Sequence, residues 1–170
     1  MTFNDRQPSG ESPFVMPDVI DRLALAMSSW GDVDWWEYNA VGLARKEERW
    51  VLRERSFDTG RHLVLRGKAE FDPTEFTKLI RQLRKLPLGA PMQGEDDVFA
   101  TDLPDWVLEC EGGGHYARVS GYGVTFRGLG DNGPGAQALK RAISLIQALG
   151  RRVIWEQRIV PDDDIPEGAS

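Results

Sequence analysis

The spacing of apolar residues divides the chain into short segments with two different periods. Near the start, apolar residues recur every three or four positions, at Val19, Ile20, Leu23, Met27 and Trp30. Pro17 stands just before them, so this helical spacing predicts a first helix over residues 17–30. The aromatic-rich segment 35–44 that follows predicts a strand.

The next two segments alternate with period two and predict a hairpin. Trp50 and Leu52 fall on one side of the first arm, and Arg53 and Arg55 fall on the other. The turn signal Asp58-Thr59-Gly60 leads to a second arm over residues 62–71, where His62, Arg66 and Lys68 share the polar side. We therefore expect a hairpin with one wet, basic face.

The rest of the chain repeats this order of elements. Asp72 and Pro73 are typical of a helix start, and the apolar stripe after them predicts a helix that stops at Pro87. After a long connection, residues 106–111 and 115–126 predict a second hairpin, residues 134–149 a helix and residues 153–160 a last strand.

These elements predict one α+β fold. We expect a mostly antiparallel sheet of five to six strands with three helices, and the order of elements admits two β-β-α halves. The expected domain spans residues 17–160, between a flexible N-terminal segment, 1–16, and a flexible acidic tail, 161–170. The predicted core consists of Leu23, Trp50, Leu65, Phe76, Ile80, Trp106, Leu108, Leu139, Ile143 and Ile146.

Charge narrows the choice of partners. The formal net charge is −6, which disfavours general nucleic-acid binding. Residues 45–85 nevertheless hold 12 Lys or Arg against 7 Asp or Glu, so a basic surface that meets an acidic protein is expected there. No apolar run approaches the roughly 18 residues of a membrane helix.

The residues available for metal or disulfide chemistry are few. Cys110 is the single cysteine and the chain has 2 histidines, so we expect no disulfide, no metal site and no cofactor. A cytoplasmic location is the simplest interpretation.

The candidate partner-binding site combines basic and aromatic side chains. Arginine and tryptophan are common anchors of protein interfaces, and Trp35 and Trp36 are adjacent, so in a strand they point to opposite faces. The predicted site consists of Trp35, Trp36, Arg53, Arg55, Arg66 and Lys68.

A second candidate site lies in the other half of the chain. His115 stands near Glu111 and Cys110, and Gly128, Gly130 and Gly133 match GxGxxG by spacing. The lysine and hydroxyl of a phosphate-binding P-loop are missing, and Asp131 would repel a phosphate, so a structural turn is the favoured interpretation of residues 128–135. A small-ligand-binding protein or a hydrolase that uses this region is the alternative function.

The predicted order of helix, three strands, helix, two strands and helix, from Pro17 to Leu149, resembles that of type III secretion chaperones and the related YbjN-like proteins. That resemblance implies a small acidic α+β protein, often a dimer, that binds a partner polypeptide. A small bacterial immunity protein, which blocks a toxin, fits the same sequence. We therefore expect a non-enzymatic module that masks a partner protein stoichiometrically. A homodimer is compatible with this expectation.

Overall fold

The computed structural model describes residues 14–30, 36–46, 49–58, 63–94, 98, 100 and 103–159, and only the backbone of residues 29–30, 36–40, 56–58, 63–64 and 157–159. The expected flexible segments therefore lie largely or wholly outside the described residues, as do Trp35, His62 and the side chain of Trp36. The elements in chain order are β1 (Arg22–Trp30), β2 (Trp36–Lys46), β3 (Arg49–Asp58), β4 (Leu63–Phe71), α1 (Pro73–Leu83), β5 (Asp105–Gly112), β6 (His115–Tyr122), α2 (Pro134–Gly150) and β7 (Ile154–Ile159).

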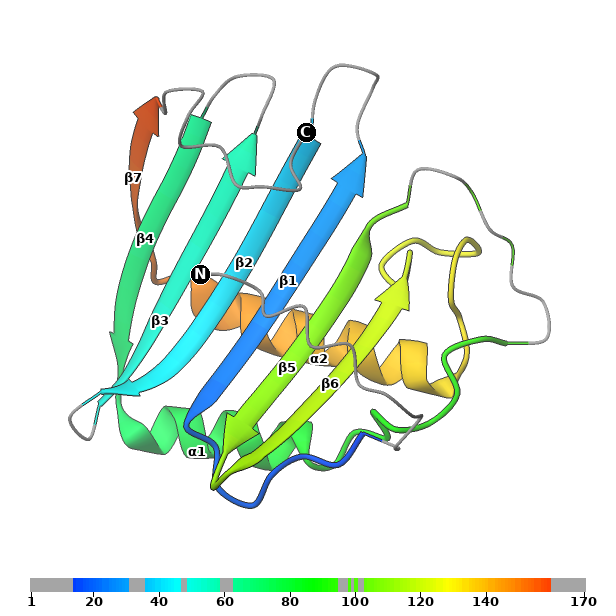
Figure 1. Ribbon diagram of the computed structural model, residues 1–170, viewed down its shortest axis with the longest axis horizontal. Coiled ribbons are helices and arrows are strands. Elements are labelled where there is room, and N and C mark those ends of the chain that lie inside the picture. Colours follow the sequence, from blue (N-terminus) through cyan, green and yellow to red (C-terminus); the bar gives the residue numbers. More distant parts are fainter. Residues whose placement is uncertain are drawn as a thin grey trace.

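All the described strands belong to one antiparallel sheet with the order β6-β5-β1-β2-β3-β4-β7 (Figure 1). The α+β class is as predicted, but the sheet has seven strands rather than five to six, and the described residues form two helices rather than three. The two predicted hairpins are present as β3-β4 and β5-β6, each followed by a helix. They do not adjoin, because β1 and β2 lie between them.

The predicted helix over residues 17–30 is wrong, because most of that segment is β1, an interior strand that lies between β5 and β2. Leu23, Leu25 and Met27 point to one face of the sheet, while Ala24 and Ala26 point to the other. Leucine, alanine and methionine all favour helices in peptides that have no tertiary contacts. Here two flanking strands supply the hydrogen bonds, and burial of both faces outweighs that preference.

Both helices lie against the same face of the sheet, behind it in Figure 1, and the core lies between these two layers. Helix α1 contributes Phe76, which stacks on Trp50 with ring centroids 3.4 Å apart. Helix α2 buries Leu139, Ile143 and Ile146. Eight of the ten predicted core residues are buried; Leu65 and Ile80 are only half-buried.

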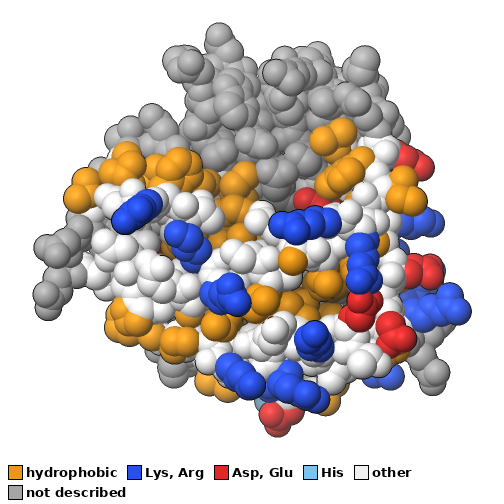
Figure 2. Space-filling model, turned by 180° about the vertical axis from the view of Figure 1, so that it is seen from behind, with side chains coloured by type: hydrophobic (Ala, Val, Ile, Leu, Met, Phe, Trp, Pro, Cys, Tyr) orange, Lys and Arg blue, Asp and Glu red, His pale blue; other side chains and the backbone are white. Residues whose placement is uncertain are grey.

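We call this side of the sheet the helix-bearing face and the opposite side the open face. Figure 2 shows the molecule from the helix-bearing side, where Lys and Arg side chains are spread between apolar patches. No helix among the described residues is long and apolar enough to cross a membrane.

Candidate partner-binding face

Four basic side chains come together on the open face. Alternation along β3 directs Leu52 into the core, and it therefore directs Arg53 and Arg55 to the open face. The register between β3 and β4 places Arg53 opposite Lys68 and Arg55 opposite Arg66. The structure thus brings together four of the six residues of the predicted site, and we call Arg53, Arg55, Arg66 and Lys68 the basic cluster.

The basic cluster opposes like charges directly across two strands. Residues opposite one another in an antiparallel pair have Cβ atoms about 5 Å apart, and like charges at that distance are destabilising. Among the described residues, no ion pair is formed by any of the four. Glu156 of β7 lies opposite Arg66, yet no ion pair joins them. In its described part the protein therefore concentrates four cations around one opposed carboxylate, that of Glu156, and none of the four forms an ion pair.

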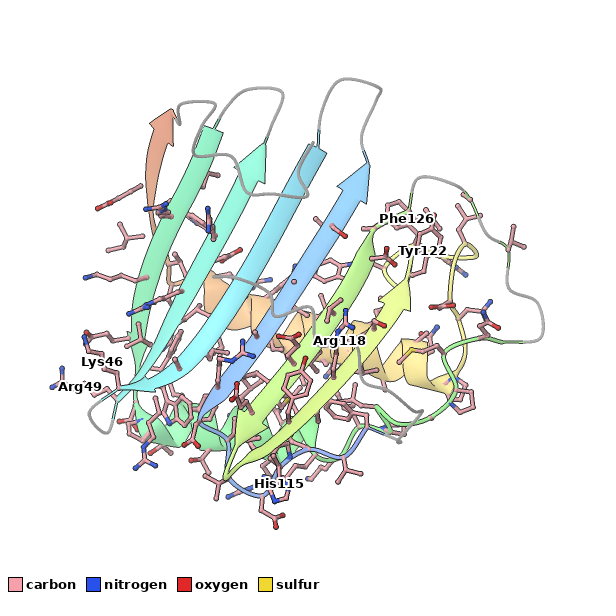
Figure 3. All side chains as sticks on the ribbon, in the orientation of Figure 1. Lys46, Arg49, His115, Arg118, Tyr122 and Phe126 are labelled. Carbon is pink, nitrogen blue, oxygen red and sulfur yellow. The ribbon has the colours of Figure 1, made fainter. Side chains whose placement is uncertain are left out.

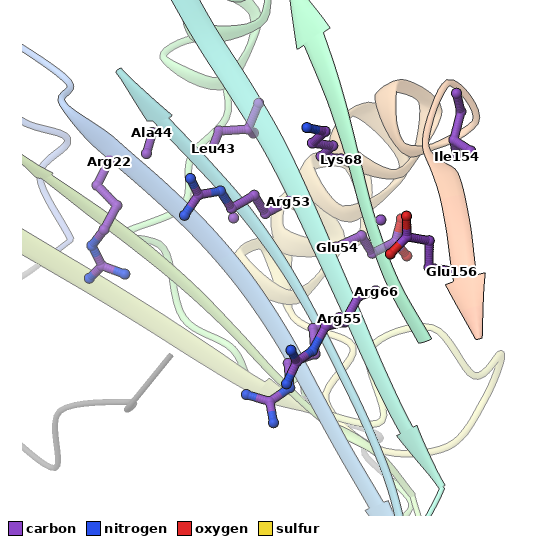
Figure 4. A pocket seen from close by; sticks show the side chains of 12 residues that line it. Arg22, Leu43, Ala44, Arg53, Glu54, Arg55, Arg66, Lys68, Ile154 and Glu156 are labelled. Atoms are coloured by element: carbon purple, nitrogen blue, oxygen red, sulfur yellow. The ribbon is translucent and has the colours of Figure 1, made fainter. Parts of the chain in front are cut away.

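A concavity of about 910 Å³ lies over this part of the sheet (Figure 4). The four side chains of the basic cluster line it, and Gly42, Ala44 and Gly67 contribute small residues to its lining. Within the described chain, the Nε atom of Arg55 is buried and has no hydrogen-bond partner. The concavity thus combines a lining of small residues with several positively charged hydrogen-bond donors. The remaining lining residues are Arg22, Leu43, Glu54, Ile154 and Glu156.

The open face has a second charged region on β5, and it is internally neutralised. Glu109 is only 4% exposed, and its carboxylate accepts a hydrogen bond from the Tyr116 hydroxyl at 2.7 Å. Arg22 donates to Glu109 at 3.3 Å and to Glu111 at 3.1 Å, and Arg118 lies 3.9 Å from Glu109. Burial, followed by the bond to Glu109, raises the pKa of Tyr116 to about 12.

Sequence reasoning missed this cluster, although a signal for it was present. Glu109 and Glu111 alternate with the buried Leu108 and Cys110, which places both carboxylates on the open face. Arg22 was hidden because its segment was predicted to be helical. The contrast is informative: every carboxylate of this cluster has a cationic partner, whereas the basic cluster has no anionic one within the described chain.

The two tryptophans of the predicted site are not placed by the structure. Trp35 lies outside the described residues. The backbone of Trp36 begins β2 and pairs with Trp30 of β1, but its side chain is not described. Their part in the site stays a prediction.

The alternative site does not assemble in the structure. His115 is exposed at the hairpin end of β6, and the loop that holds Phe126 follows the other end of the same strand (Figure 3). Glu111 is engaged with Arg22, and His115 pairs in register with Gly112. Cys110 is buried in the core, and burial raises the pKa of its thiol to about 12, far from that of a reactive thiolate.

The glycine-rich junction before α2 is a packed joint. The N–H groups of Gly133 and Gly135 donate to the carbonyl groups of Met92 and Pro91 at 2.7 and 2.8 Å. Gly133 is the N-cap of α2, and neither Asp131 nor Asn132 caps the helix with its side chain. Asp131 instead accepts a hydrogen bond from the backbone N–H of Tyr122. The N–H groups of Gly133 and Gly135 are thus already bonded within the protein, which favours a structural turn over phosphate binding.

A smaller cavity of about 220 Å³ lies on the helix-bearing side of the sheet. Trp106, only 6% exposed, contributes to its wall, and the Nε1 atom of this tryptophan is buried with no partner among the described residues. Glu54 lines the same cavity, and burial raises the pKa of its carboxyl group. Within the described chain, no group of three or more His, Cys, Asp or Glu residues could hold a metal ion.

Comparisons with protein-family models, with curated proteins and with solved structures found no match. The resemblance to type III secretion chaperones and YbjN-like proteins therefore stays a prediction.

Proposed function

We propose that this protein is a non-enzymatic binding module whose open face receives an acidic segment of a partner protein. The proposal depends on the basic cluster, whose four cations oppose one another in pairs and form no ion pair among the described residues, with Glu156 as the one carboxylate opposite them. An acidic segment laid across Arg53, Arg55, Arg66 and Lys68 would relieve that repulsion and occupy the concavity.

The mode of action is stoichiometric masking of the partner's surface. A concavity of this size on a sheet face, lined by several long cationic side chains, suits an extended or helical polypeptide better than a small substrate. A cytoplasmic chaperone-like protein and an immunity protein both act in this way. They differ in the partner, which is a protein to be exported in the first case and a toxin in the second.

A charge-reversal pair tests the proposed face. We expect wild-type protein to bind a fluorescent peptide of about ten aspartates at low ionic strength, with an affinity that falls as salt is added. Arg53→Glu/Arg66→Glu should weaken that binding by about tenfold or more, because two attractive contacts become repulsive. Fluorescence anisotropy gives the affinity, and thermal unfolding shows whether the variant remains folded.

A matched control separates the site from net charge. Lys78 and Arg141 are exposed on α1 and α2, and Lys78→Glu/Arg141→Glu changes the net charge by the same amount on the helix-bearing side. This control should retain most of the peptide binding. Equal loss in the two double variants, or binding that survives Arg53→Glu/Arg66→Glu, would show that the open face is not the site.

A further inference from the structure

Strand β7 ends the sheet with one side unpaired. It forms an antiparallel ladder with β4, from Lys68 opposite Ile154 to Leu63 opposite Ile159, and no described strand lies beyond it (Figure 1). An edge strand presents a row of free N–H and C=O groups, which is a template for pairing with another chain.

Strand β7 begins with two exposed apolar side chains, followed by the exposed Glu156. Ile154 is 80% exposed and Trp155 is 41% exposed. Trp155 also lies over Gly67, where a Cβ atom would be 3.4 Å from the indole Cε3 atom. Proteins commonly protect such edges with charged residues, proline or covering loops.

The opposite edge has such protection. At the end of β6, the backbone N–H of Asp131 donates to the carbonyl group of Tyr122 at 2.7 Å. The backbone N–H of Tyr122 in turn donates to the carboxylate of Asp131, also at 2.7 Å. Arg118, on the same strand, adds an exposed charge beside Glu109. Strand β7 also carries an exposed charge, Glu156, but no backbone contact like that of Asp131 closes on it within the described chain.

The sequence of β7 is complementary to itself when reversed. It reads IWEQRI from Ile154 to Ile159. When two copies pair antiparallel about Gln157, Glu156 falls opposite Arg158 of the second copy, and Trp155 falls opposite Ile159. Each dimer then holds two opposite-charge pairs and two apolar pairs, which is the pattern that stabilises antiparallel strands.

Neighbouring registers lose this match. Centring the pair on Glu156 or on Arg158 places that residue opposite its own copy, which opposes like charges. Centring it between Glu156 and Gln157 places Trp155 opposite Arg158 and leaves Glu156 without a cation. A single register is therefore favoured by charge and by apolar contact together.

We propose that β7 pairs antiparallel with β7 of a second copy of this chain, about a two-fold axis through Gln157. Directly opposite residues point to the same side of a sheet, so the dimer would join the two sheets with both open faces on one side. Five paired residues of each copy, Trp155 to Ile159, bury less than the roughly 1,200 Å² of a standard interface, so the dimer is weak and concentration-dependent. This pairing does not depend on the proposed function of the basic cluster.

A charge swap tests the register. Glu156→Arg opposes two arginines at each charge pair, and Arg158→Glu opposes two glutamates, so each single variant should weaken dimerisation by about tenfold or more. The double variant Glu156→Arg/Arg158→Glu restores opposite charges and should recover dimerisation. Sedimentation equilibrium over a range from about 1 µM to about 500 µM, at low salt, measures each dissociation constant.

The double variant also removes an ambiguity. Glu156 faces Arg66 within one copy, so Glu156→Arg could perturb the monomer by itself. The double variant retains that perturbation, and recovery of the dimer can then come only from the pairing between copies. Ser120→Arg adds a charge to the opposite edge strand and should leave the dimer unchanged. A wild-type protein that stays monomeric over the whole range, or a double variant that is no better than the singles, would overturn the proposal.

Discussion

At the scale of single residues, Glu54 shows how a buried carboxyl group links stability to pH. It lies on the helix-bearing side of β3, and burial raises its pKa above the ordinary value of 4.5. The folded state therefore holds the proton more tightly than the unfolded state does. Its contribution to stability is fully present below about pH 4.5 and is lost as pH rises through the raised pKa.

Glu54→Gln should consequently make the protein more stable at neutral pH. The neutral amide avoids the cost of burying a charge, and the gain is a fraction of a kcal/mol because the half-exposed site is screened by solvent. Urea unfolding at several pH values should give a difference from wild type that grows from about pH 4 to about pH 7. Asp18→Asn, at an exposed position before β1 whose side chain forms no ion pair among the described residues, is the control. A difference that is independent of pH would contradict the role of burial.

At the scale of elements, the sequence was most informative where alternation and turn chemistry agreed. The hairpin β3-β4 was predicted with its correct faces, because Trp50 and Leu52 alternate with Arg53 and Arg55. The start of α1 was also predicted, and Asp72 accepts a hydrogen bond from the Thr74 N–H at 2.7 Å. In both cases local chemistry and tertiary packing favour the same structure.

Strand β1 failed for the opposite reason. Leu23, Leu25 and Met27 do alternate, but Ala24 and Ala26 between them are also apolar, so the strand period was obscured. The alanines point to the open face, where Ala24 lies opposite Gly42 and Ala26 lies opposite Ala40 of β2. This pairing with β2 is not visible in the sequence of β1 alone. The glycines before α2 likewise depend on contacts that are remote in sequence.

Gly135→Ala tests that remote contact. In an ordinary helix this substitution stabilises by about 1 kcal/mol. Here the added Cβ atom would lie 2.1 Å from the carbonyl oxygen of Ala90, so the clash should win and lower the free energy of unfolding by about 1–3 kcal/mol. Gln137→Ala, an exposed change two residues further along α2, should leave stability nearly unchanged or slightly improve it. Equal stability of the two variants in urea would show that the backbone around Ala90 moves aside at little cost and the clash is relieved.

At the scale of the whole molecule, the candidate site could be predicted only in part. The basic cluster follows from alternation along β3 and β4, and the pairing of these two strands, which are neighbours in sequence, brings its four residues together. The neutralised cluster around Glu109 could not be predicted, because it joins β1 to β5 across 87 residues of chain. The position of β7 beside β4 is equally non-local, so the exposed edge emerges only from the assembled sheet.

The same assembly predicts a gradient of local stability across the sheet. Strand β1 is held by ladders on both sides, and its Leu23, Ala24 and Leu25 are almost fully buried. Strand β7 has one ladder and exposed side chains, so it can open without disturbing the core. Hydrogen exchange followed by mass spectrometry should therefore find peptides of β1 among the slowest to exchange and those of β7 among the fastest at low protein concentration. If β7 also pairs between copies, its exchange should slow as concentration rises while that of β6 stays constant. Exchange of β1 as fast as that of β7 would contradict the interior place of β1, because an amide flanked by two ladders is released only when the sheet itself comes apart.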